Sequence, residues 1–239
     1  MRGVSRRHVV VQTIPRAERA VIEALGRMGT ATVHEAIGRQ GFVGPDLRPI
    51  QEGTRLAGSA ITVSCHPGDN LMIHAAVEVC TEGDVLVVTN TAPSMHGMLG
   101  ELLATSLTTR GVRALVIDAG VRDTAELRQM GFAVWSRAVS CEGTLKAAPG
   151  SVNVPVVLGG QVVRPGDVVC ADDDGVVVVA REEATCARDQ AQARVAREDA
   201  TRARLAAGEL GVDIYGLRPQ LRELGVEYVD HLDDLEAPE

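Results

Sequence analysis

The stretch that decides the fold is Ala114-Leu-Val-Ile-Asp-Ala-Gly-Val121, which runs directly into Arg122 and Asp123. Its aliphatic and β-branched residues predict a buried strand over residues 114–118. Parallel sheets place the carboxyl ends of their strands along one edge, and open α/β sheets bind ligands outside that edge. The pattern therefore predicts that Arg122 and Asp123 lie where a ligand would bind.

Strand-like and helix-like segments alternate around this stretch. The apolar runs at residues 83–89 and 133–137 predict further strands, and the periodic segments at residues 97–110 and 123–130 predict helices. Strand–helix–strand repeats of this length are typical of parallel βαβ units. We therefore expect an α/β protein with a parallel sheet at its centre.

The flanking segments follow the same patterns. Toward the amino end we expect a strand, two helices, a second strand and a third helix, at residues 9–13, 15–28, 30–37, 57–65 and 70–79, with Thr30 as a helix cap. Toward the carboxyl end we expect short β segments at residues 152–157, 162–163, 167–171 and 176–179, with an Asp174-Gly175 hairpin turn. A polar helix over residues 182–207 follows, and its thin apolar face predicts a partner or partial exposure.

The composition limits the class of protein. Of the 239 residues, 45% are hydrophobic but only 2% are aromatic, so the core must be built from Val, Leu, Ala and Ile. The formal charge of −8 makes nucleic acid and anionic membranes poor partners. No segment resembles a membrane span or a secretory signal, and the five scattered cysteines are typical of reduced thiols. We therefore expect a cytoplasmic protein with neither a nucleic-acid nor a membrane partner.

Carboxylates can hold a divalent metal, and a fixed cation beside them can stabilise an enolate. Glu101 lies in the first turn of the helix predicted at residues 97–110, and twenty residues separate it from Arg122. Each group also has a simpler interpretation. Asp123 with Glu126 fits a helix capping box, Glu101 suits the helix dipole, and Arg122 alone is typical of a surface arginine. Both interpretations stay open on these residues alone.

The start of that helix, Gly97-Met-Leu-Gly-Glu-Leu-Leu-Ala104, is a second candidate. Its free backbone N–H groups and the helix dipole would suit a substrate carboxylate. The alternative is a helix start that needs small residues for packing. Neighbouring strand ends in a parallel sheet would bring this segment toward Arg122, which favours a shared binding site.

Other candidate motifs carry less chemistry. Asp172-Asp-Asp-Gly175 lacks the spacing of a calcium loop, so a solvated turn is favoured. His34-Glu35 fits a helix pair or a pocket role, and no histidine lies in a zinc or phospho-acceptor motif. Schiff-base aldol chemistry would depend on Lys146, the only lysine, which instead fits an exposed or substrate-contacting cation. Metal-assisted enolate formation is the economical alternative.

Several motifs together resemble the RraA-like superfamily. They are Pro67-Gly-Asp-Asn70, Gly100-Glu-Leu-Leu-Ala104, Val116-Ile-Asp-Ala-Gly-Val-Arg-Asp123, Val134-Trp-Ser136, Asn153-Val-Pro155, Pro165-Gly-Asp167 and Asp172-Asp-Asp-Gly-Val176. From about residue 9 to residue 228 the chain is similar to the class II 4-hydroxy-4-methyl-2-oxoglutarate / 4-carboxy-4-hydroxy-2-oxoadipate aldolases of bacterial aromatic-compound catabolism. The family pattern is an acid, twenty residues, then Arg-Asp, and here the acid is Glu101 rather than the aspartate of some members.

The resemblance implies an architecture. It is an α-β-β-α sandwich of the swivelling β/β/α type with a C-terminal helical extension. The aldolase domain would cover residues 1–207, and an arm at residues 208–239 would pack on a neighbouring subunit. The assembly would be a homo-oligomer, a trimer or a hexamer, with active sites between protomers.

The resemblance also implies residue roles. Asp123 is the expected ligand of Mg²⁺ or Mn²⁺, Glu101 acts through water, and Glu198 of an adjacent subunit approaches the metal. Arg122 holds the enolate oxyanion. The 2-oxo acid substrate is expected against Gly100, Glu101, Leu102, Leu103 and Arg122. Contacts of Lys146 or Arg137 to the distal carboxylates stay open.

The implied activity is that of a metal-dependent pyruvate aldolase, a carbon–carbon lyase. It cleaves 4-carboxy-4-hydroxy-2-oxoadipate to pyruvate and oxaloacetate, or 4-hydroxy-4-methyl-2-oxoglutarate to two pyruvates. Oxaloacetate decarboxylation is expected as a second activity because it passes through the same enolate. The alternative is a non-catalytic regulator that binds an RNA-degrading enzyme. Members of that kind are expected to lack the acid, so Glu101 favours the enzyme.

Overall fold

In the computed structural model, which describes residues 8–232, the stretch Ala114–Val121 forms strand β5 near the centre of a nine-stranded sheet. The strands follow the order β1-β6-β5-β3-β2-β10-β11, with β4 paired to β5 and β7 paired to β2. Neighbours β6, β5, β3 and β2 run parallel, which confirms the predicted βαβ units. The remaining pairs of the main path are antiparallel.

The bounds of the strands are β1 Arg48–Pro49, β2 Leu56–Cys65, β3 Asp84–Asn90, β4 Gly97–Leu99, β5 Ala114–Val121, β6 Ala133–Val139, β7 Ser151–Val152, β8 Val156–Leu158, β9 Gln161–Val163, β10 Val168–Asp172 and β11 Gly175–Val179. Strands β8 and β9 form a separate two-stranded sheet. The helices of this part of the chain are α1 Arg19–Arg27, α2 Thr30–Ala36, α3 Leu71–Val77, α4 Glu101–Thr109 and α5 Thr124–Met130.

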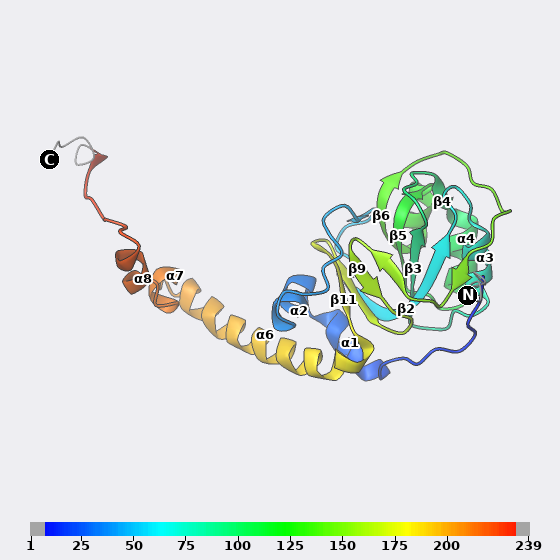
Figure 1. Ribbon diagram of the computed structural model, residues 1–239. Helices are drawn as coiled ribbons and strands as arrows, with labels where there is room; N and C mark the ends of the chain where they lie inside the picture. The colour runs from blue at the N-terminus through cyan, green and yellow to red at the C-terminus, as the bar shows by residue number, and fades with distance from the viewer. Residues whose placement is uncertain (1–7, 233–239) are drawn as a thin grey trace, which may run out of the picture. The chain divides into compact units, whose positions relative to one another are not determined.

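Alternate residues of the central strands face two different cores. On β3, Leu86 and Val88 face a core that α3, α4 and α5 complete. Val85 and Val87 face a second core, which residues of β8 to β11 complete. A third core lies between the other face of β10 and β11 and the helices α1, α2 and α6. The β10–β11 end of this one sheet curls over its parallel part, so the layers run helix, sheet, sheet, helix, which confirms the predicted sandwich (Figure 1).

The chain divides into two compact units, Met1–Ala193 and Arg194–Glu239. The division falls inside α6, Ala184–Ala206, which buries only Ala184, Ala187 and Ala191 and so confirms the thin apolar face. The second unit continues with α7, Gly211–Ile214, and α8, Arg218–Glu223. None of its described residues, 194–232, is buried. The boundary at residue 207 and the docking of the arm stay predictions.

Three local predictions are wrong. The strand expected at residues 9–13 is reduced to a single bridge between Val10 and Val152, because only this one residue pair of the segment has β pairing. Gly97–Leu99 is strand β4 rather than the start of α4, since it pairs with the end of β5. The cap of α2 is Gly29, and Thr30 instead bonds to Asp172. Across residues 8–232 we find no helix with the length and apolarity needed to cross a membrane.

Candidate active site

Strand β5 ends in a backbone conformation that is uncommon for a residue with a side chain. The N–H of Arg122 donates to the carbonyl of Leu99 on β4 at 2.9 Å, which ties the two strand ends together. Asp123 then adopts the left-handed conformation, with φ 54° and ψ 41°. Aspartate tolerates this region better than most residues, and such outliers gather at functional sites. The sheet edge therefore presents Arg122 and Asp123 from a sharply turned backbone.

The Asp123 carboxylate serves the neighbouring helix rather than its own. Asp123 is the N-cap residue of α5, but its side chain makes no capping hydrogen bond there. Its Oδ2 instead accepts from the N–H of Glu101, the first residue of α4, at 3.1 Å. The predicted capping box with Glu126 is wrong because a capping residue needs an extended backbone, which the left-handed Asp123 lacks.

Gly100 provides the room for this contact. A Cβ at Gly100 would lie 2.2 Å from Asp123 Oδ2 and 3.0 Å from Arg122 Cγ. Real Cβ atoms essentially never come so close, so any other residue would displace the carboxylate. Gly100 thus acts by having no side chain, as expected where a backbone passes close to a functional group.

The three predicted charged residues meet at this edge of the sheet. Arg122 Nε lies 3.7 Å from Asp123 Oδ2, and both side chains are nearly half exposed. The carboxylate of Glu101 extends along α4, where Oε1 accepts from the Thr105 hydroxyl at 3.2 Å. Among residues 8–232, no hydrogen bond reaches Asp123 Oδ1. One oxygen of Asp123 is therefore tied down, and the other is available to a ligand.

Two backbone donors lie beside this carboxylate. The N–H groups of Leu102 and Leu103 belong to the first turn of α4, where no earlier turn supplies an acceptor. Neither has a partner in the part of the chain that the structure describes. The Leu102 side chain is 80% exposed, whereas Leu103 packs into the helix-covered core. The α4 N-terminus can therefore receive an anion next to Arg122 and Asp123.

The family described as Aldolase/RraA, or RraA-like, matches residues 30–178 of this chain. That range holds all of the sheet except its last residue, Val179, and every residue named so far in the site. The chain belongs to the RraA-like family.

Relatives and solved structures agree with this placement. A protein of Halalkalibacterium halodurans, provisionally named a 4-hydroxy-4-methyl-2-oxoglutarate aldolase, is 30% identical over 56% of this chain and 64% of its own length. The chain thus spans less than two thirds of that relative. A protein of Burkholderia multivorans with the same provisional name is 36% identical over 57% of this chain and 82% of its own length. The crystal structure of Streptomyces coelicolor RraAS2, of the RNase ES inhibitor RraA protein family, superposes with a TM-score of 0.72 at 28% identity, covering 80% of this chain and 99% of that one.

The other predicted residues of this RraA-like chain lie elsewhere. Glu198 belongs to the second unit and pairs with Arg194 at 2.6 Å, and its approach to a neighbouring metal site stays a prediction. Arg137 pairs with Asp118 and with Asp46, and the hydrogen bond to Asp118 raises the pKa of its guanidinium. It lines a hollow of about 460 Å³ together with Asn90, Thr91, Ala92, Pro93, Met95 and Asp118.

Lys146 and His34 remain outside this set of contacts. Lys146 is exposed in the loop after β6, and the pKa of His74 is lowered by burial and by the nearby Lys146 ammonium. His34 lies on α2 with its ring against Phe42, at a centroid distance of 6.1 Å. This edge-to-face contact agrees with a packing role. The described residues contain no group of three or more His, Cys, Asp or Glu side chains that could hold a metal. Any ion at Asp123 would keep mainly water or substrate ligands.

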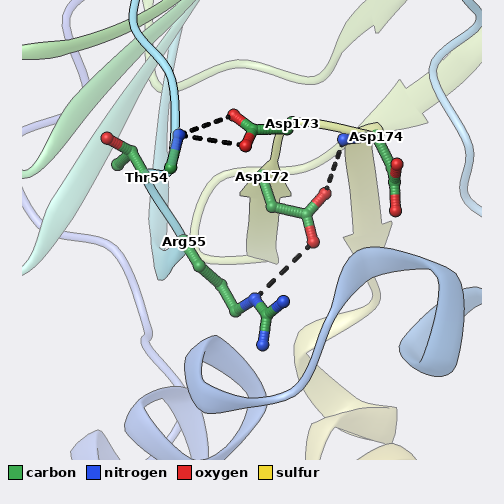
Figure 2. Close-up of a pocket in the computed structure, with 6 residues that line it drawn as sticks. Thr54, Arg55, Asp172, Asp173 and Asp174 are labelled. Carbon is green, nitrogen blue, oxygen red and sulfur yellow. Dashed lines mark hydrogen bonds and ion pairs between the residues drawn. The ribbon is translucent and has the colours of Figure 1, made fainter.

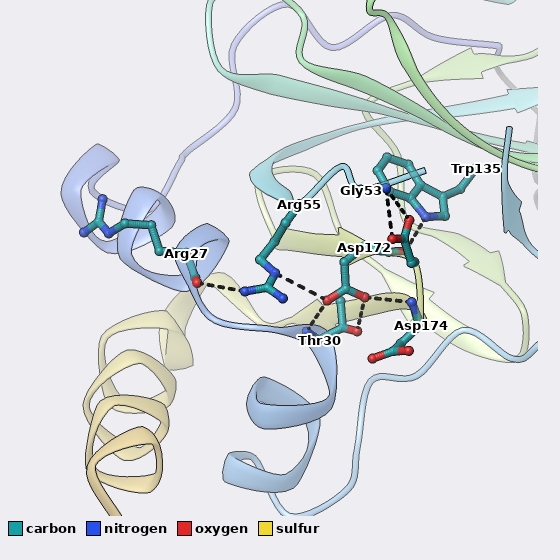
Figure 3. Close-up of polar contacts among 8 residues, drawn as sticks. Arg27, Thr30, Gly53, Arg55, Trp135, Asp172 and Asp174 are labelled. Atoms are coloured by element: carbon teal, nitrogen blue, oxygen red, sulfur yellow. Dashed lines mark hydrogen bonds and ion pairs between the residues drawn. The ribbon is translucent and has the colours of Figure 1, made fainter. Parts of the chain in front are cut away.

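The Asp172 turn is a structural junction. Asp172 is buried, and its carboxylate accepts from the N–H and hydroxyl of Thr30 at 2.8 and 2.5 Å and from the N–H of Asp174 at 3.0 Å. Asp173 is exposed and accepts from the N–H of Gly53 (Figures 2 and 3). The turn was predicted as solvated, but Asp172 joins it to the start of α2. Gly53 and the three aspartates line a hollow of about 370 Å³ together with Thr54 and Arg55, and none of these residues belongs to the Arg122 site.

Proposed function

We propose that this chain is a divalent-metal-dependent pyruvate aldolase. Its substrates would be 4-carboxy-4-hydroxy-2-oxoadipate, cleaved to pyruvate and oxaloacetate, and 4-hydroxy-4-methyl-2-oxoglutarate, cleaved to two pyruvates. Oxaloacetate decarboxylation would accompany both. The observation that carries the proposal is the placement of Asp123 and Arg122 against the N-terminus of α4, with Gly100 leaving room. The provisional names of its relatives support the same class of reaction.

The residues fit a divalent cation. Asp123 Oδ2 is anchored by the Glu101 N–H, so the carboxylate is held in place while its second oxygen is left for a ligand. Carboxylate oxygen is a preferred ligand of Mg²⁺, which keeps several waters and needs few protein ligands. Asp123 would therefore hold Mg²⁺ or Mn²⁺, and Glu101 would contact it through water. When bound, the ion would act as a Lewis acid toward the 2-oxo group of the substrate.

The protein groups would each act on a stated part of the substrate. The N–H groups of Leu102 and Leu103 would receive the substrate carboxylate, because they are free donors at a helix N-terminus. Glu101, or Glu198 of the partner subunit, would take the proton of the C4 hydroxyl. The C3–C4 bond then breaks, and its electron pair forms the enolate of pyruvate. Arg122 would donate to that enolate oxygen, and proton return to C3 completes the turnover.

If Arg122 stabilises the enolate oxygen, its substitution should lower kcat measurably. Removing one preorganised donor commonly costs about 10²- to 10³-fold in kcat. We expect Arg122→Ala to lower kcat by about that factor and Arg122→Lys to retain more activity, since it keeps the charge but not the planar fork. Pyruvate release from 4-hydroxy-4-methyl-2-oxoglutarate with Mg²⁺, followed through lactate dehydrogenase, measures both. Full activity after EDTA treatment, or a near-normal kcat in Arg122→Ala, would refute the scheme.

A second function is a protein-binding regulator without chemistry. The similarity to RraAS2, with a TM-score of 0.72, favours it. It predicts no pyruvate release from any of the three substrates and retention of an RNA-degrading enzyme in pull-down experiments. The same coupled assay therefore separates the two functions. Assembly into a trimer or hexamer with the C-terminal arm on a neighbour belongs to the aldolase proposal, and light scattering of the purified protein tests it.

A further inference from the structure

The loop between β6 and β7, residues 140–150, is fixed to the rest of the sheet without any regular structure of its own. Its first attachment lies beside the strand ends. The N–H of Ser140 donates to the carbonyl of Val121 at 2.9 Å, and the N–H of Gly97 donates to the carbonyl of Glu142 at 2.9 Å. Glu142 Oε1 also lies 3.2 Å from Nε2 of His96. The loop therefore begins next to Arg122.

Its second attachment is a single carboxylate. Asp69 is 3% exposed, and one of its oxygens accepts from the N–H groups of Ala147 and Ala148 at 2.7 and 2.9 Å. The other oxygen accepts from the N–H of Leu71 at the start of α3, at 2.9 Å. Leu145 adds a pair of backbone hydrogen bonds to the same turn. Asp69 thus joins the loop to the N-terminus of α3.

Between the two attachments the loop passes the guanidinium of Arg122. A Cβ at Gly143 would have Arg122 Nη1 as its nearest neighbour, at 4.0 Å. Arg122 is nearly half exposed and has a long, flexible side chain, so its direction depends on what surrounds it. The loop is one of the groups that surround Arg122, and the hydrogen bonds of Asp69 and Glu142 hold the loop in position.

We propose that Asp69 is a positioning residue for Arg122, acting through the β6–β7 loop. The proposal rests on the proposed function, since positioning has a catalytic consequence only if Arg122 holds the enolate oxygen. A buried carboxylate that loses its charge also loses strong hydrogen bonds to backbone N–H groups. The loop residues 143–148 would then move, and the guanidinium would lose a neighbour that limits its directions. A misplacement of about 1 Å can cost about 10²-fold in rate.

The test compares Asp69→Asn with a matched control, Asp167→Asn. Asp167 is equally buried and accepts two backbone N–H groups, from Arg164 and Arg181 at 2.8 and 3.0 Å, but among residues 8–232 none of its hydrogen bonds reaches the β6–β7 loop. Hydrogen exchange of the full-length protein, measured by mass spectrometry without substrate, reports on the loop. We expect residues 143–148 to exchange at least about tenfold faster in Asp69→Asn and at the wild-type rate in Asp167→Asn.

Kinetics then test the link to Arg122. We expect Asp69→Asn to lower kcat by about 10- to 100-fold with a smaller change in KM. In an Arg122→Lys background, Asp69→Asn should lower kcat by less than about twofold, because the effects of residues that act through one group are not additive. A purely structural role would give equal losses in both backgrounds.

Three results would overturn the inference: unchanged exchange in the loop, equal kcat losses with Arg122 and with Lys at position 122, or the same losses in Asp167→Asn. Wild-type protein that releases no pyruvate would refute the proposed function instead. In that case the exchange experiment, which needs no substrate, still decides whether Asp69 holds the loop.

Discussion

A single missing methyl group sets the geometry beside Asp123. Because a Cβ at Gly100 would lie 2.2 Å from Asp123 Oδ2, we expect Gly100→Ala to displace the carboxylate and to lower metal-dependent turnover by about 100-fold. Gly29→Ala is the matched control, since its Cβ would come no closer than 3.6 Å to another group. The metal concentration that gives half-maximal rate should rise in Gly100→Ala alone. Equal metal dependence in the two variants would contradict the steric role.

The charge on Asp69 predicts a pH dependence of stability. Burial opposes ionisation, but three backbone N–H donors outweigh it, so the pKa of the carboxyl is lowered. A lowered pKa contributes stability above the ordinary value of about 3.9, and this is lost as the pH falls through the folded-state pKa. The Tm difference between wild type and Asp69→Asn should therefore be constant from about pH 5 to 8 and shrink below about pH 4.

Asp167 supplies the opposite sign for comparison. Burial raises the pKa of this carboxyl, despite backbone donors from Arg164 and Arg181. A raised pKa gives stability that is complete below the ordinary value and lost as the pH rises through the folded-state value. Wild type should thus lose stability relative to Asp167→Asn as the pH rises above about 4. Thermal unfolding at several pH values measures both variants, and parallel curves would contradict both signs.

The sequence predicted where these residues lie better than it predicted their contacts. The twenty-residue spacing and the strand before Arg122 predicted that Glu101, Arg122 and Asp123 come together at one sheet edge, and the three residues do so, although Glu101 takes part through its backbone N–H. The partner of the Asp123 carboxylate could not be predicted, because it depends on a left-handed backbone and on the register shift of β5 between Ile117 and Gly120. The sequence shows that Asp69 is an acid just before a helix, but it does not show that this carboxylate accepts a hydrogen bond from Ala147, 78 residues later.

At the scale of secondary structure, Asp172 joins the β10–β11 hairpin to helix α2. Asp172→Ala leaves the N–H and hydroxyl of Thr30 and the N–H of Asp174 without their acceptor. A buried donor without an acceptor costs about 1–3 kcal/mol, so we expect a loss of about 2–5 kcal/mol in the free energy of unfolding. Urea titration followed by circular dichroism measures it.

Asp173→Ala is the adjacent control. Asp173 is exposed, and its substitution removes the hydrogen bond from the N–H of Gly53, so the free energy of unfolding should change by no more than about 1 kcal/mol. Neither variant should change the metal dependence of turnover, because the hollow at this junction shares no residue with the Arg122 site. Equal destabilisation by the two variants would show that the buried hydrogen bonds of Asp172 are not the main contribution.

The elements were predicted where apolar runs or helical patterns are long. Strands β3 and β5 alternate between two apolar cores, so each reads as a continuous aliphatic run. Strand β4 was missed because three residues carry no period, and its pairing with Gly120 and Val121 is a tertiary contact. The N-terminal segment has the composition of a strand but forms one bridge, since composition does not supply a partner.

At the scale of the whole molecule, the cysteines predict a count of reactive thiols. All five are free, and only Cys141 and Cys186 are exposed. Burial raises the pKa of Cys65, Cys80 and Cys170 to about 12, so these stay protonated and unreactive in the folded state. Ellman's reagent at about pH 8 should therefore modify two thiols quickly and all five after denaturation. A third fast-reacting thiol would show that one core opens readily.

The second unit shows what the sequence of one chain leaves open. Large apolar side chains of Leu205, Leu210, Tyr215, Leu224, Tyr228 and Leu232 are exposed there. Helix α6 continues into this unit although none of the described residues beyond Ala191 is buried. Apolar side chains of this size are stabilised by contact with another surface. Helical periodicity does not show which surface covers these side chains. The expectation that a neighbouring subunit covers them therefore comes only from the family resemblance.

Trp135 gives the molecule a single indole fluorophore. It is the only tryptophan, it is fully buried between the two β layers, and its indole N–H donates to the carbonyl of Asp172 at 2.8 Å. Its emission wavelength will therefore report when water enters the interior of the sandwich. Loosening of the C-terminal unit, which contains no indole, will leave that emission wavelength unchanged. Stopped-flow fluorescence can thus follow the opening of the sandwich separately from changes in the C-terminal unit.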